Sequence, residues 1–208
     1  MNGADVVQLA VIVANVIVSL VGFRAFGGDD PASADEFVFV PHQVTEGRNG
    51  RGLLLSHFAH GDVGHLALNM WGLYSFAQPV IGVLGSAWFL AIYGIAAAGA
   101  DLAVFALRKD DPAYRCLGAS GSVFGIMTAA VVLDPHITIV MFFVPAPIPG
   151  PLFMLGYAVV SMFLISRTRR SGVCHEAHLG GALFGLAVTG LLAPRGLQPL
   201  LGWVTQWM

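Results

Sequence analysis

Long apolar runs separated by polar breaks make up most of this chain. The first run, Val6 to Phe23, contains no charged residue. A bilayer core of about 30 Å needs about 20 apolar residues per helix, and fewer where partner helices shield the ends. The pattern therefore predicts six membrane-spanning helices, at Val6 to Phe23, Gly64 to Ile81, Leu84 to Leu107, Gly118 to Leu133, Leu152 to Ser166 and His175 to Leu192.

Two stretches between these runs differ from short connecting loops. Residues 24–63 form a long first loop, whose part from Arg24 to Arg51 is polar, and a loop of that length is expected to have its own structure or a functional position. The piece HITIVMFFVPAPIPGP, residues 136–151, holds four prolines, which cannot all occupy the interior of one helix. We therefore expect the fifth span to begin near Leu152 and to be short. The whole pattern predicts an all-α polytopic membrane protein, a single membrane domain over residues 1–208.

Composition supports this class. Of the 208 residues, 56% are hydrophobic and 11% are charged, with a mean hydropathy of +0.76, whereas soluble domains carry about 25% charged residues. The net charge is −2, which gives no basic face for phosphates. We expect the lipid bilayer as a partner and no nucleic acid. The first run lacks a basic leading region and a clear cleavage site, so it is expected to remain as a helix.

Four polar residues inside the apolar runs are candidates for chemistry, because unpaired polar groups in a bilayer are costly. Ser120 and His178 lie in the first turns of the fourth and sixth spans, which begin on the same side if the third and fifth spans return the chain. That placement permits a serine nucleophile with a histidine base. His65 and Asn69 share one helix face at positions i and i+4. Both can donate hydrogen bonds toward one developing oxyanion.

Glycines accompany both candidate catalytic residues. Gly121 with Gly125, and Gly181 with Gly185, give the fourth and sixth spans a small residue at every fourth position. Such faces let two helix backbones approach closely in a membrane. Close approach is what a Ser-His hydrogen bond of about 3 Å between helices needs.

Other motifs fit the sequence less well. The HEAH segment, His175 to His178, has the wrong spacing for the HExxH metalloprotease motif, and LGASGS lacks the second glycine of the hydrolase elbow GxSxG. A metal or haem protein that uses its histidines, such as His57, His60 and His65, is a weaker alternative, because no cysteine or carboxylate stands at a matching spacing.

Taken together, these segments resemble the motifs of the rhomboid family of intramembrane serine proteases. The family's GASG with its downstream glycine, its HxxxxHxxxN and its AHxxGxxxG are all present and in order. They fall on Gly118, Ala119, Ser120, Gly121 and Gly125, on His60, His65 and Asn69, and on Ala177, His178, Gly181 and Gly185. The resemblance implies a six-helix rhomboid-like bundle that hydrolyses peptide bonds in or near transmembrane segments of other membrane proteins, without a cofactor or metal.

The resemblance also implies a role for each residue. Ser120 would be the nucleophile and His178 the general base, with no acidic third member. His65, Asn69 and the Ser120 N–H would form the oxyanion site, and Phe124 would place an aromatic ring under the histidine. The short fifth span would be a mobile gate for substrate helices. A catalytically inactive rhomboid-like protein that binds membrane clients is the alternative function, although such proteins usually lose the serine or the histidine.

Several expectations concern the surroundings of this site. His60 is expected to be structural and to bond a loop carbonyl. A water-filled polar cavity is expected to be lined by Ser56, His57, His60, His65 and Ser122. Asp101 is expected to reach toward the membrane surface or to pair with Arg108.

The two cysteines of the chain lie close in sequence to the candidate catalytic residues. Cys116 and Cys174 each stand four residues before a candidate catalytic residue. Two free thiols are expected there, and a disulfide above the site, between two helically continued segments, is the alternative. The compact core predicts a prokaryotic plasma membrane, bacterial or archaeal, as the location, and the membrane of an organelle is the alternative.

Overall fold

The computed structural model describes residues 3–28, 31–141, 144–167 and 172–206 and is mostly helical. Its long helices are α1 (Gly3–Phe26), α5 (Val63–Leu84), α6 (Ser86–Arg108), α7 (Ser120–Leu133), α8 (Gly150–Arg167) and α9 (His175–Leu192). The six predicted spans fall on these helices in order. Three described segments are long and apolar enough to cross a membrane, namely Asp5–Phe26, Ser86–Arg108 and Gly150–Arg167. A total of six crossing helices therefore stays a prediction.

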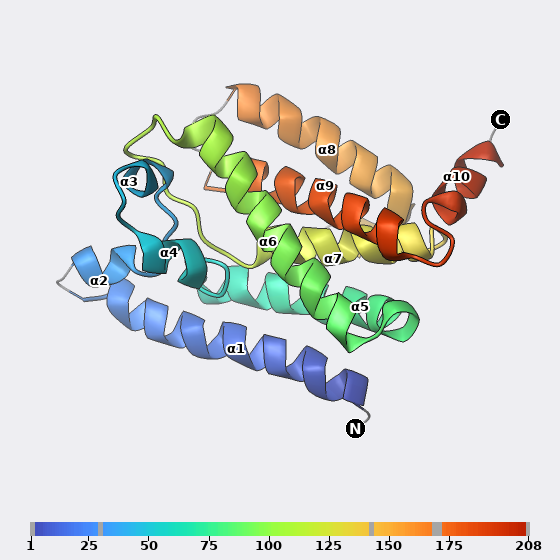
Figure 1. Ribbon diagram of the computed structural model, residues 1–208, viewed down its shortest axis with the longest axis horizontal. Helices are drawn as coiled ribbons and strands as arrows, with labels where there is room; N and C mark the ends of the chain where they lie inside the picture. Colours follow the sequence, from blue (N-terminus) through green and yellow to red (C-terminus); the bar gives the residue numbers. More distant parts are fainter. Residues whose placement is uncertain (1–2, 29–30, 142–143, 168–171, 207–208) are drawn as a thin grey trace.

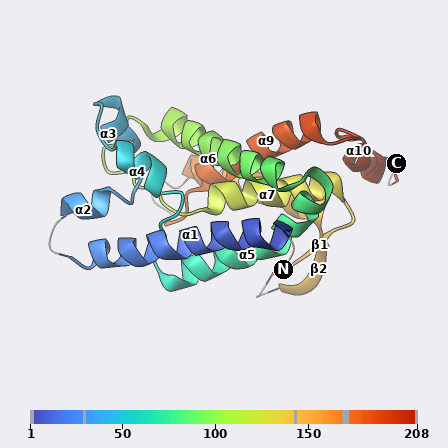
Figure 2. The same ribbon diagram turned by 60° about the horizontal axis from the view of Figure 1, so that its bottom comes forward.

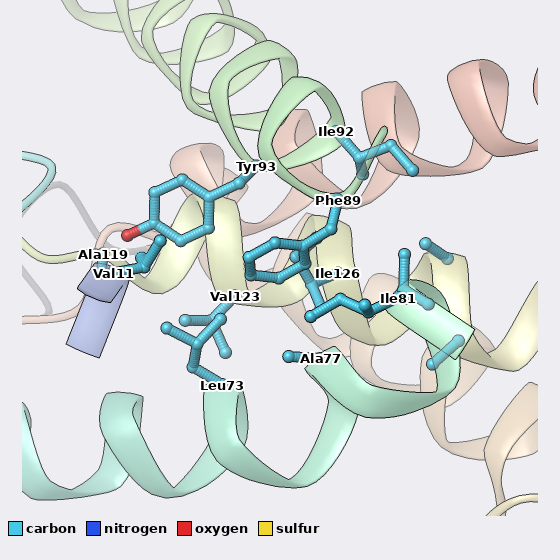
Figure 3. Close-up of a cluster of buried hydrophobic side chains, with 13 residues drawn as sticks. Val11, Leu73, Ala77, Ile81, Phe89, Ile92, Tyr93, Ala119, Val123 and Ile126 are labelled. Carbon is cyan, nitrogen blue, oxygen red and sulfur yellow. The ribbon is translucent and has the colours of Figure 1, made fainter. Parts of the chain in front are cut away.

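The helices form a bundle with α7 in its interior. In Figures 1 and 2, α1 and α5 lie side by side on one side of α7, while α6 and α9 cover the other side. Eleven of the fourteen residues of α7 are buried. The core cluster in Figure 3 joins α5, α6 and α7 through side chains such as Leu73, Phe89, Tyr93, Val123 and Ile126. Burial of α7 on nearly all faces explains why a short apolar helix is held at the centre.

The helix α1 faces the bundle with a polar stripe, which lies within its charge-free run of residues 6–23. Gln8, Asn15 and Ser19 are at most 3% exposed. The Asn15 amide donates to the Tyr93 hydroxyl at 3.2 Å, and the Gln8 amide donates to the Tyr74 carbonyl at 2.9 Å. These hydrogen bonds fix which face of α1 is turned toward α5 and α6. Apolar contacts alone would define that rotation about the helix axis less well.

The polar loop between α1 and α5 has its own structure, as expected, although its residues 29 and 30 lie outside the described ranges. It contains α2 (Pro31–Asp35), α3 (Pro41–Thr45) and α4 (Gly50–Leu55). Asn49 adopts a left-handed conformation with φ of 61°. Its side chain accepts a hydrogen bond from the Val40 N–H and donates to the carbonyls of Asp35 and Val38. One side chain thus ties the short helices together.

The all-α prediction was wrong for the proline-rich piece. It forms an antiparallel hairpin of β1 (Thr138–Met141) and β2 (Val144–Pro149), in which Ile139 pairs with Ile148. Proline removes a donor and is excluded from helix interiors, but an edge strand accepts it. The fifth predicted span begins two residues early, at Gly150, and the C-terminal segment forms α10 (Gln198–Thr205).

Candidate active site

The structure brings Ser120 and His178 together where two parallel helices begin. The Ser120 hydroxyl oxygen lies 2.6 Å from His178 Nε2. Ser120 is the first residue of α7, and His178 is in the first turn of α9. The first N–H groups of a helix have no intrahelical partner, so the Ser120 N–H is available to a ligand beside the hydroxyl. The contact expected from the sequence is therefore present.

The glycines bring α7 and α9 into backbone contact. A Cβ atom at Gly181 would overlap with the Gly121 carbonyl, and one at Gly185 would overlap with the Gly125 carbonyl. Gly121 lies against Gly181, and Gly125 lies against Gly185 one turn later, so the two helices run parallel. This is the close approach that the small-residue spacing predicts.

An aromatic ring supports the histidine from below. The Phe124 ring, one turn after Ser120, stacks on the His178 ring with centroids 4.6 Å apart and an angle of 17° between planes. His178 itself is only 7% exposed. The ring is therefore held in one plane against α7, as expected for Phe124.

Of the two expected oxyanion donors, His65 lies beside the backbone that precedes Ser120, and Asn69 is bonded to His65. An added Cβ at Gly118, whose φ is +123°, would lie 2.8 Å from His65 Nε2, so the missing side chain lets the imidazole approach the backbone before Ser120. The Asn69 amide donates to the His65 carbonyl at 3.0 Å. An amide group carries two N–H groups, and this bond uses one of them.

His60 fixes the backbone just before the serine. Its Nε2 accepts from the Ala119 N–H at 3.4 Å, and its Nδ1 lies 2.9 Å from the Ser19 hydroxyl. That hydroxyl donates to the Phe58 carbonyl at 3.0 Å, so the histidine must donate to Ser19 and accept from Ala119. His60 is therefore structural, as expected, and the Ser19 hydroxyl stands between it and the loop carbonyl.

The cysteines form a disulfide, so the expectation of two free thiols was wrong. Cys116 and Cys174 are joined with their Cα atoms 6.0 Å apart. The helical continuation behind the disulfide hypothesis does not occur, because Cys116 pairs in an extended bridge with Phe39 and α7 begins only at Ser120. The bond links the two segments that enter α7 and α9.

Two charged residues have partners that the sequence analysis did not predict. Asp101 bonds to His57 Nε2 at 2.8 Å and not to Arg108, because seven residues along a helix separate two side chains by about 10 Å. Arg108 pairs with Glu176, which is 3% exposed and also accepts from the Tyr114 hydroxyl at 2.8 Å. The His57–Asp101 pair borders the same small cavity as Cys116 of the disulfide.

A small cavity in the described part of the chain has only part of the lining that we expected for the polar cavity. A cavity of about 10 Å³ is bordered by Ser56, His57, Asp101, Gly118 and Gly121 among others, which is about the space of one water molecule. Three of the five expected lining residues do not border it, namely His60, His65 and Ser122, and of these His60 and Ser122 are fully buried.

One contact of the site lacked any sequence signal. The hydroxyl of Tyr157, on α8, is hydrogen-bonded to His178 Nδ1. The two residues are 21 positions apart on different helices, so no local spacing relates them. Only the knowledge that α8 packs beside α9, as in Figure 1, could have suggested the pair. Within the described ranges, His, Cys, Asp and Glu side chains form no group suited to holding a metal ion.

Comparison with known proteins places the sequence of this chain in a family. Residues 48–195 match the model of the Rhomboid domain. The mouse (Mus musculus) presenilin-associated rhomboid-like protein, mitochondrial, is 30% identical over 142 residues, which cover 64% of this chain and 36% of that protein. The Arabidopsis thaliana RHOMBOID-like protein 12, mitochondrial, is 31% identical over 146 residues, with coverages of 62% and 43%. The matched regions thus span less than half the length of these relatives.

A third relative has the same location in its name. The Saccharomyces cerevisiae Rhomboid protein 1, mitochondrial, is 32% identical over 137 residues, covering 63% of this chain and 38% of that protein. All three relatives are mitochondrial by name, and this overturns the expectation of a prokaryotic plasma membrane, which rested only on the compact core. Since the matched region spans α5 to α9 and includes Ser120, His178, His65 and Asn69, this chain belongs to the rhomboid family.

Proposed function

We propose that this chain is an intramembrane serine endopeptidase of the rhomboid type. The observation that carries the proposal is the 2.6 Å contact between the Ser120 hydroxyl and His178 Nε2. It joins a hydroxyl at a helix N-terminus to a buried imidazole that is oriented by Phe124. That is the geometry of a serine activated by a neighbouring base.

Ser120, His178, His65 and Asn69 have separate roles in the proposed reaction. Ser120 Oγ attacks the carbonyl carbon of the substrate peptide bond, its proton passes to His178 Nε2, and the carbonyl π electrons move to the oxygen. The Ser120 N–H, His65 and Asn69 donate to that oxyanion, and α7 contributes the positive end of its dipole. His178 returns the proton to the leaving amine, and water then hydrolyses the acyl-enzyme by the same route.

The fold suggests how a membrane substrate is presented. We propose that α1, α5, α6, α7, α8 and α9 all span the bilayer as one membrane domain, with α8 as the mobile element. Only Gly150 and Ser161 are buried on α8, and six of its apolar side chains, Leu155 and Phe163 among them, are more than half exposed. Substrates would be transmembrane segments that approach along this helix from the lipid.

Labelling with a serine-directed fluorophosphonate tests the proposed function. We expect purified wild-type protein to be labelled, and labelling to be lost in Ser120→Ala and in His178→Ala. Ser122→Ala, which removes a buried hydroxyl two residues away, is the matched control and should still be labelled. A folded wild type that stays unlabelled would favour the inactive, client-binding alternative.

A second experiment addresses the substrate class. An intact helix hides its carbonyl groups in internal hydrogen bonds, so we propose that cleavage requires small or helix-breaking residues near the cut. A panel of transmembrane substrates should be cleaved more slowly when proline and glycine are replaced by leucine. Equal cleavage across the panel would refute the preference.

A further inference from the structure

The contact between Tyr157 and the candidate base has no role in the dyad chemistry described above. The Tyr157 hydroxyl is bonded to Nδ1 of His178, while Nε2 of the same ring faces Ser120. Phe124 packs on both rings, with centroids 4.6 Å from His178 and 4.3 Å from Tyr157. Both nitrogens of the imidazole are thus occupied, one by the nucleophile and one by a residue of α8.

The direction of this hydrogen bond follows from the chemistry of the base. A neutral imidazole has one N–H and one acceptor nitrogen. His178 can take the Ser120 proton only if Nε2 is the acceptor, so the ring hydrogen must be on Nδ1 and must be donated to the Tyr157 oxygen. When Nε2 gains the serine proton, the ring becomes a cation with two N–H groups. The Tyr157 oxygen then accepts from a charged donor, and such bonds are stronger than neutral ones.

The hydroxyl hydrogen of Tyr157 has an acceptor nearby on its own helix. Ser161 follows Tyr157 by one turn, is fully buried, and its hydroxyl interacts with that of Tyr157. The Ser161 oxygen has no hydrogen bond of normal geometry to any described residue, so it is open to that hydrogen. Tyr157 can therefore accept from His178 and donate along α8 at the same time.

We propose that Tyr157 is a neutral third member of the catalytic array, which holds His178 in the Nδ1–H tautomer and stabilises its cation during acyl transfer. This inference rests on the proposed protease function. It assigns to a tyrosine the positioning role that an acidic residue has in a Ser-His-Asp triad. Because Tyr157 belongs to α8, the base is complete only while that helix is packed against α9.

Tyr157→Phe tests the proposal, because it keeps the ring on Phe124 and removes only the hydroxyl. We expect kcat to fall about 10- to 100-fold, as for loss of a hydrogen bond to a charged group, with KM within about twofold. The rate of fluorophosphonate labelling should fall by a similar factor. Tyr74→Phe, on a side chain 66% exposed, is the matched control and should change neither rate. Wild-type rates in Tyr157→Phe would overturn the proposal.

A spectroscopic measurement separates this inference from the proposed function. Nitrogen-15 NMR of the histidine rings, with His178 assigned by its absence in His178→Ala, reports which ring nitrogen carries the hydrogen. We expect Nδ1–H in the wild type and a shift toward Nε2–H in Tyr157→Phe. Nε2–H in the wild type would overturn the role of Tyr157 whether or not the protein is labelled. Labelling that persists in Ser120→Ala would instead refute the protease function and leave the tautomer result standing.

Discussion

Ser19 in the first helix and His60 in the loop before α5 share a hydrogen bond of 2.9 Å across 41 positions of sequence. The other ring nitrogen of His60 accepts a hydrogen bond from the Ala119 N–H, one residue before the candidate nucleophile. Ser19 lies outside the matched Rhomboid region, which begins at residue 48. The first helix is therefore coupled to the candidate active site by a chain of two polar side chains.

Removing the Ser19 hydroxyl should weaken this coupling. Ser19→Ala leaves the buried His60 Nδ1–H without its acceptor, and an unpaired buried donor costs about 1–3 kcal/mol. We expect the free energy of unfolding in detergent to fall by that amount and fluorophosphonate labelling to slow. Ser75→Ala removes an exposed hydroxyl that bonds the Trp71 carbonyl and should have almost no effect. Equal stabilities of the two variants would contradict the coupling.

Because His60 is buried, we also expect the folded protein to become less stable in acid. Burial lowers the pKa of His60 to about 4, against about 6.5 in an unfolded chain. Between these values the unfolded state binds a proton that the folded state does not, so stability rises with pH. The contribution is complete above pH 6.5 and is lost as pH falls toward 4, on the order of 3 kcal/mol in total.

Denaturation of the wild type and of His60→Gln in detergent, from pH 7.5 to pH 4, measures this contribution. The glutamine variant should be less stable at pH 7.5 and should lose less stability on acidification, so the difference between the two proteins should shrink as pH falls. A difference that stays constant over this range would show that His60 does not bind the proton on unfolding.

The sequence was sufficient for the parts of the site that follow from local spacing. Ser120, His178 and the paired glycines could be placed because a helix returns to the same face about every fourth residue, and Gly181 indeed lies against Gly121. Contacts that depend on helix rotation could not be found in this way. Ser19 shares one helix face with Gln8 and Asn15, but that spacing does not indicate which residues of other segments these side chains bond. Tyr157 required the packing of α8 against α9.

The loops were the least predictable part for a related reason. Pro145, Pro147 and Pro149 exclude a continuous helix over residues 138–149, but the pairing of Ile139 with Ile148 depends on a register that composition does not determine. Glu176 reads as one more helix residue, and its bonds to Tyr114 and Arg108 form only because three separate segments meet there.

The disulfide should stabilise the candidate site. Cys116 and Cys174 are 58 positions apart, and bonds that close loops of this kind contribute about 2–4 kcal/mol. Mass mapping without reductant should find the two residues joined, and Cys116→Ala with Cys174→Ala should lower the thermal midpoint. Reductant should lower the midpoint of the wild type and leave that of the double variant unchanged. Recovery of two free thiols from the untreated protein would refute the bond.

The contact of α7 with α9 can be tested with two glycine substitutions of opposite expected sign. In Gly181→Ala the new methyl group overlaps with the Gly121 carbonyl, so α9 must shift away from Ser120. Overpacking of this kind costs about 1–3 kcal/mol, and we expect labelling of Ser120 to be largely lost with it. Gly156→Ala, on α8, is the matched control, because nothing lies within 4 Å of the added atom. It should stabilise the protein by about 0.5–1 kcal/mol, since alanine favours helix interiors over glycine. If both variants lose stability equally, the effect comes from the substitution itself and not from the contact between the two helices.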